Sequence, residues 1–85
     1  MKVEKTTFEV DGFKEPCFLV SSDDDFVQVR ISTCYHLIGS DNIYVREYID
    51  GEFNSEDEWC NFHGIKGMTK KDALEVAKKY SIYLR

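Results

Sequence analysis

The dipeptide Asp11-Gly12 constrains the fold of this chain more than any other feature, because alternating residues flank it on both sides. Aspartate and glycine accept the positive φ angles of a two-residue type I′ turn, which joins neighbouring antiparallel strands. This turn predicts a hairpin in which Val10 lies opposite Phe13. One face of the hairpin is then mostly apolar, with Phe8, Val10, Phe13, Cys17 and Leu19.

The only proline, Pro16, falls in the second strand of this predicted hairpin. Proline has no backbone N–H and cannot donate a hydrogen bond to a neighbouring strand. We therefore expect this strand to lie at an edge of the sheet, or to be interrupted at Pro16.

Two further segments, residues 26–33 and 43–49, alternate between apolar and polar residues as half-buried strands do. Polar residues and a glycine separate them and favour a hairpin loop. Asp50-Gly51 then repeats the turn chemistry and predicts a short fifth strand, with Phe53 opposite Tyr48.

The periodicity changes after residue 54, where two segments have the form of a helix capping box. Ser55-Glu56-Asp57-Glu58 predicts a short helix over about residues 56–63, and Thr69-Lys70-Lys71-Asp72 predicts a longer one over about residues 70–80. The inner stripe of the longer helix consists of Ala73, Val76, Ala77 and Tyr80.

Together these elements predict an α+β fold. We expect an antiparallel sheet of four or five strands in two hairpins, followed by one short and one longer C-terminal helix packed on one face. The 85 residues, 1–85, form a single domain, since a chain of this length has no room for a second core. A hydrophobic content of 42% and an aromatic content of 14% disfavour disorder.

The sequence contains no apolar run of membrane-spanning length. Residues 1–5 lead into alternating residues and not into the apolar stretch of a signal peptide, so we expect a cytoplasmic protein.

The three cysteines, Cys17, Cys34 and Cys60, are odd in number and widely spaced. This disfavours a disulfide framework and favours thiols that are buried as small apolar groups.

Potential metal ligands occur in two pairs, Cys34 with His36 and Cys60 with His63. Side chains two residues apart share a face of a strand, and side chains three residues apart share a face of a helix. Two such pairs on touching elements would suit zinc, which takes four sulfur and nitrogen ligands in a tetrahedron. The Cys-x-His spacing is unusual, so a zinc-binding regulatory or structural module is the alternative hypothesis, and we expect no cofactor.

No set of residues predicts catalysis. Cys60 would lie near a helix N-terminus, but the acidic residues 56–58 at the same end oppose thiolate formation. The sequence has no glycine-rich phosphate loop and no dinucleotide fingerprint. Direct nucleic-acid binding is disfavoured by the acidic isoelectric point of about 4.9, although lysines recur after residue 65. We therefore expect a non-enzymatic protein.

The net charge of −5 divides into −9 for residues 1–64 and +4 for residues 65–85. Carboxylates cluster at residues 23–25 and 52–58, where they can imitate an array of phosphates and compete for the basic groove of a nucleic-acid-handling enzyme. The alternative is an ordinary acidic surface that limits aggregation. The residues expected to contact the partner are Asp23, Asp24, Asp25, Glu52, Glu56, Asp57, Glu58 and Trp59.

These properties predict a small acidic protein-binding module, an inhibitor or adaptor whose partner has a basic surface. An accessory protein of a phage or mobile element would fit this description. A homodimer formed through an exposed strand edge is a further alternative.

Overall fold

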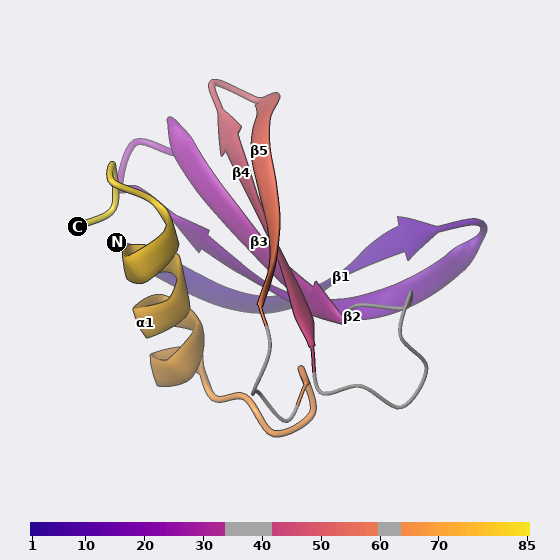
Figure 1. Ribbon diagram of the computed structural model, residues 1–85. Helices are drawn as coiled ribbons and strands as arrows, with labels where there is room; N and C mark the ends of the chain where they lie inside the picture. Colours follow the sequence, from indigo (N-terminus) through magenta and orange to yellow (C-terminus); the bar gives the residue numbers. More distant parts are fainter. Residues whose placement is uncertain (34–41, 60–63) are drawn as a thin grey trace.

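The computed structural model describes residues 1–33, 42–59 and 64–85. It contains a five-stranded antiparallel sheet in the order β1-β2-β3-β4-β5 and, within the described residues, one helix, α1 (Figure 1). Every strand therefore pairs with its neighbour in the sequence, and the predicted α+β character is confirmed. The elements are β1 Lys2–Val10, β2 Phe13–Ser21, β3 Val27–Thr33, β4 Ile43–Ile49, β5 Glu52–Trp59 and α1 Lys70–Tyr80.

The first hairpin has the register that the Asp-Gly turn predicts. Asp11 and Gly12 have φ angles of 50° and 83°, and Val10 lies opposite Phe13. The positive φ angles match the right-handed twist of the two strands, so the turn joins them without splaying them.

The β4–β5 hairpin repeats this geometry, with φ angles of 52° at Asp50 and 79° at Gly51. Phe53 lies opposite Tyr48, as predicted, and a register shift follows between Glu47 and Tyr48. Glu47 faces the α1 side of the sheet with only 4% of its surface exposed, and its Oε1 accepts a hydrogen bond of 2.7 Å from Asn54 Nδ2.

The helix predicted over residues 56–63 is wrong for residues 56–59, because β5 extends to Trp59. Residues 60–63 lie outside the described residues. The capping pattern at residues 55–58 is local, whereas pairing with β4 satisfies the backbone of the whole segment. Ser55 instead shares a hydrogen bond of 2.7 Å with the Tyr80 hydroxyl, and Glu58 Oε1 accepts one of 2.7 Å from Asn42 Nδ2.

Pro16 neither interrupts β2 nor places it at an edge, because the edge strands are β1 and β5. Within the described residues, however, pairing between β2 and β3 begins only at Cys17, while Pro16 pairs with Thr7 of β1. The proline thus lies where β2 has a single neighbour, which is the part of the strand that tolerates a missing donor.

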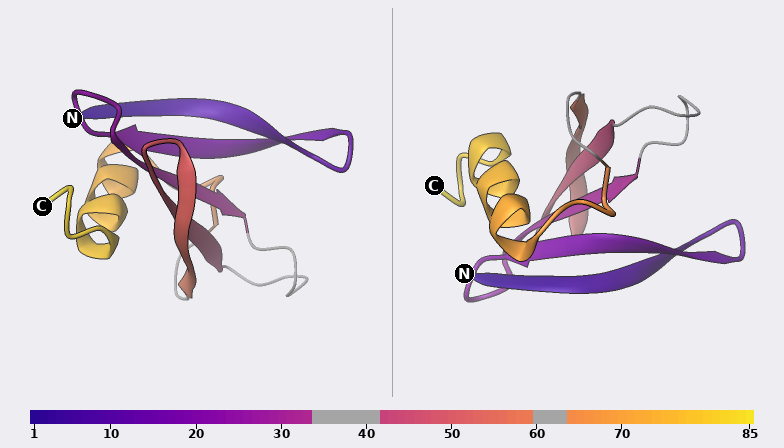
Figure 2. Two further views of the ribbon diagram at one scale, coloured as in Figure 1. Left: turned by 90° about the horizontal axis from the view of Figure 1, so that it is seen from above. Right: turned by 90° about the horizontal axis from the view of Figure 1, so that it is seen from below.

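The apolar core lies between the sheet and α1, which covers one sheet face (Figure 2). The helix begins at Thr69, whose side chain accepts a hydrogen bond from Asp72 N in a capping box, as predicted. Ala73, Val76 and Ala77 are buried against the sheet, and Tyr80 packs partly against the same core. The strands contribute Phe18, Val20, Val27, Val29, Ile31, Ile43 and Val45.

No helix in the described ranges is long and apolar enough to cross a bilayer.

The capping interaction at Thr69 predicts a measurable stability loss. Replacing Thr69 with alanine removes the acceptor of the 3.1 Å bond from Asp72 N, and we expect the free energy of unfolding to fall by about 1 kcal/mol. Urea denaturation followed by circular dichroism measures this change. Lys71→Ala, at an exposed position in the same turn, is the control and should change stability by less than about 0.5 kcal/mol. Equal losses in the two variants would contradict the capping role.

The capping box also predicts a dependence on pH. The hydrogen bond from Thr69 N holds the pKa of Asp72 below its ordinary value of 3.8, so the ionised carboxyl favours the folded state. This contribution is complete above the unfolded-state pKa and is lost as the pH falls through the lower folded-state pKa. Urea titrations between pH 6 and pH 2.5 should show a smaller acid-induced loss for Asp72→Asn than for wild type; parallel curves would contradict this assignment.

Candidate functional site

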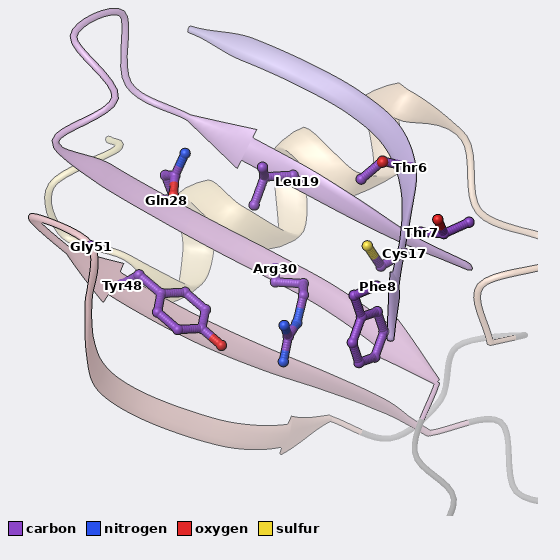
Figure 3. Close-up of a pocket in the computed structure, with 9 residues that line it drawn as sticks. All are labelled: Thr6, Thr7, Phe8, Cys17, Leu19, Gln28, Arg30, Tyr48 and Gly51. Atoms are coloured by element: carbon purple, nitrogen blue, oxygen red, sulfur yellow. The ribbon is translucent and has the colours of Figure 1, made fainter. Parts of the chain in front are cut away.

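The sheet face opposite α1 carries a hollow of about 320 Å³ (Figure 3). Alternation along the strands creates this face, because the residues between the core positions of β2, β3 and β4 point away from the helix. The lining residues are Thr6, Thr7, Phe8, Cys17, Leu19, Gln28, Arg30, Tyr48 and Gly51. Apolar walls with a few polar groups are typical of sites for small ligands.

Arg30 is the cationic group of the hollow. Its guanidinium carbon lies 4.1 Å from the centre of the Phe8 ring and 5.6 Å from that of Tyr48, so aromatic rings from β1 and β4 flank a side chain from β3. Its Nε is buried and, in the part of the chain that the structure describes, has no hydrogen-bond partner. Cation–π contact stabilises the charge, but it leaves the in-plane N–H donors free for an acceptor.

Arg46 lies directly opposite Arg30 on β4 and presents its side chain on the same face. Its guanidinium carbon is 4.7 Å from the Phe53 ring centre, and its Nε lies 3.5 Å from Glu56 Oε1. That contact is an ion pair without hydrogen-bond geometry. The two arginines therefore differ, because Arg46 has a carboxylate beside it.

Cys17 forms part of the floor of the hollow and is 1% exposed. Burial raises the pKa of its thiol, and Glu4 adds to this effect, while the charge of Arg30 acts in the opposite direction. Because the thiol stays protonated and shielded, Cys17 behaves as a small apolar residue and not as a nucleophile.

The first acidic cluster forms the loop between β2 and β3. Asp24 Oδ1 accepts hydrogen bonds from Ser22 Oγ at 2.7 Å and from Phe26 N at 3.1 Å, which lower the pKa of its carboxyl group. Asp23 pairs with the N-terminal ammonium group, which lowers the pKa of Asp23, and Asp25 pairs with Lys2. Asp24 is thus part of the loop structure, while its neighbours are paired at the surface.

The second cluster lies on the edge strand β5. Glu56 and Glu58 lie opposite Arg46 and Tyr44 on the open face, whereas Asp57 alternates to the other face. Asp57 Oδ2 accepts a hydrogen bond of 3.1 Å from Trp59 Nε1.

The sheet places the start of the second acidic cluster beside the first. Asp50 N, in the β4–β5 turn, donates a hydrogen bond of 2.8 Å to Phe26 O, at the end of the β2–β3 loop. We call the exposed carboxylates along this end and edge of the sheet, on either face, the acidic border: Asp23, Asp24, Asp25, Asp50, Glu52, Glu56, Asp57 and Glu58.

Trp59, expected at the partner contact, lies at the margin of the core. Its ring packs edge-to-face on Tyr80, with ring centres 6.0 Å apart, and it is only half-buried. It therefore supports the contact between β5 and α1 and still exposes part of its surface beside the acidic border.

Cys34, His36, Cys60 and His63, the potential zinc ligands, lie outside the described residues. Among the residues that are described, no group of three or more histidine, cysteine, aspartate or glutamate side chains has metal-binding geometry.

No family model, no curated protein and no solved structure matches this chain. The candidate sites are therefore defined by their geometry.

Sequence analysis did not identify the arginine-containing hollow. Arg30 and Gln28 alternate with core valines in the sequence, which indicates their shared face. The contribution of Phe8 and Tyr48 could not be inferred, because their proximity to Arg30 depends on the twist and order of four strands.

The burial of Cys17 predicts slow alkylation. In the folded protein iodoacetamide should modify Cys17 much more slowly than in urea, because only the exposed thiolate reacts. Trypsin cleavage after Lys14 and Arg30 releases a peptide with Cys17 as its only cysteine, so mass spectrometry can follow this site alone. A synthetic peptide of residues 15–30 is the control. Equal rates for the peptide and the native protein would show that the thiol is accessible.

Proposed function

We propose that this chain is a non-enzymatic protein-binding module of the cytoplasm, which docks the acidic border against a basic surface of its partner. It would act as an inhibitor or adaptor, and blocking a nucleic-acid-handling protein is its most specific form. The observation that carries the proposal is the hydrogen bond between Asp50 N and Phe26 O, because it places the β4–β5 turn, where the second cluster begins, beside the loop that holds the first.

The charges of the acidic border suit this role because its carboxyl groups are exposed. Asp23 is 88% exposed, and its ion pair with the terminal ammonium group lies in solvent. Ion pairs between exposed groups are weak, so lysine or arginine side chains of a partner can compete for these carboxylates. A row of like charges also raises the rate of encounter with an oppositely charged surface.

The same carboxylates disfavour a homodimer through the edge of β5. Three consecutive acidic residues, Glu56, Asp57 and Glu58, would meet one another in an antiparallel pair of β5 strands centred on Asp57. Like charges across paired strands are destabilising, and charged edge strands are a common protection against such pairing.

Charge removal that preserves the fold tests the proposal. The variant Asp23→Asn/Asp25→Asn/Glu52→Gln removes three charges from the acidic border, and asparagine tolerates the positive φ of 60° at Asp25. The partner is captured on the immobilised protein, identified and purified, and its association rate is measured from 20 to 500 mM NaCl. We expect the wild-type rate to fall about tenfold or more with salt, and the variant to associate slowly even at low salt.

The control variant Glu9→Gln/Asp11→Asn/Glu75→Gln removes the same number of charges outside the acidic border, and Asn-Gly preserves the first turn. It should associate at nearly the wild-type rate. Association that is independent of salt, or equally affected by both triple variants, would disprove the proposed docking surface.

A further inference from the structure

We infer that the hollow on the sheet face opposite α1 binds a small organic carboxylate, whose anionic group contacts Arg30 and whose apolar body contacts Phe8, Leu19 and Tyr48. This site is distinct from the acidic border, because it has the opposite charge and is formed by other residues.

Arg30 provides the main reason. A guanidinium group offers five N–H donors in a plane and matches a carboxylate in a two-point contact. The rings of Phe8 and Tyr48 flank this group, and no carboxylate within the described ranges lies within 4.0 Å of it. The buried Nε is also without an acceptor there. A partly buried cation without a counter-ion is unfavourable, so a bound anion would be stabilised.

The pairing of β3 with β4 provides a second, independent reason. Arg30 and Arg46 are directly opposed, and like charges at opposed positions of a sheet repel each other. Glu56 lies beside Arg46 and offsets one of the two charges. An anion at Arg30 would offset the other.

The hollow also indicates what the anion is attached to. Its volume of about 320 Å³ is at the lower end of the range for small-molecule sites. Leu19, Phe8 and Tyr48 offer apolar contact, while Thr6 and Gln28 add hydrogen-bonding groups at the wall. A compact ring or short aliphatic chain that carries a carboxylate matches these walls.

A monoanion fits better than a phosphate. Glu4 lies opposite Leu19 on the open face, and the protein as a whole has a net charge of −5. Repulsion from these charges grows with the charge of the ligand, whereas the attraction comes from one guanidinium group without a counter-ion.

Benzoate and its uncharged analogue benzamide test the inference in an NMR titration of the ¹⁵N-labelled protein. We expect benzoate to cause saturable shifts of the amide signals of Leu19, Gln28, Arg30 and Tyr48 and of the Arg30 Nε–H signal. Benzamide should bind about tenfold or more weakly, because it lacks the charge that strengthens hydrogen bonds to arginine. Inorganic phosphate should bind more weakly than benzoate.

Arg30→Met keeps the aliphatic part of the side chain and removes the charge, and it should weaken benzoate binding about tenfold or more. The control Lys14→Met removes one positive charge from the opposite face of the β1–β2 hairpin and should bind within twofold of wild type. If Arg30→Met does not fold, Arg30→Lys keeps the charge but loses the planar two-point contact, and it should still bind measurably more weakly.

Three results would overturn the inference: no saturable shifts with benzoate, equal affinity for benzoate and benzamide, or unchanged benzoate binding in a folded Arg30 variant. Phosphate binding as tight as that of benzoate would also overturn it, because the apolar walls would then contribute nothing. None of these results depends on the acidic border, so each proposal can fail alone.

Discussion

The contact between α1 and the sheet determines which face of the sheet is buried. The helix lies against β1, β2 and β3, and its Tyr80 also meets Trp59 of β5. An isolated small sheet is marginally stable in water, so burial of one face by this helix stabilises the sheet. Among the described residues α1 covers one face, and the residues that alternate to the other face include Arg30 and Arg46.

The division of charge along the sequence does not show where the acidic clusters and the two arginines lie in the folded protein. The two acidic clusters lie around one end and one edge of the sheet, whereas the arginines occupy the centre of its open face. Aromatic rings flank both guanidinium groups. The rings hold these like charges on neighbouring strands by cation–π contact, and Arg46 is also paired with Glu56 of the acidic border. The hollow at Arg30 and the acidic border are thus made of different residues, although Glu56 lies beside Arg46 on the open face.

Local chemistry predicted the elements that depend on few neighbours. Asp11-Gly12 and Asp50-Gly51 specify their hairpins because few other residues accept those φ angles, and the Thr69 capping box agrees with the apolar stripe that follows it. The same capping pattern at Ser55 predicted a helix wrongly, because the pairing of this segment with β4 outweighs the local helix preference of four residues. The hollow was not predicted because it combines residues from the four strands β1, β2, β3 and β4 and from the β4–β5 turn.

The order of the elements along the chain has a consequence during synthesis. Each strand pairs with the one made just before it, so the sheet can assemble from contacts that are close in sequence, which favours rapid folding. The helix follows all five strands, however, and the valines and isoleucines of β3 and β4 stay exposed to solvent until residues 70–80 have left the ribosome. Over that interval the nascent sheet is open to aggregation, and the carboxylates along β5 repel other unfinished copies.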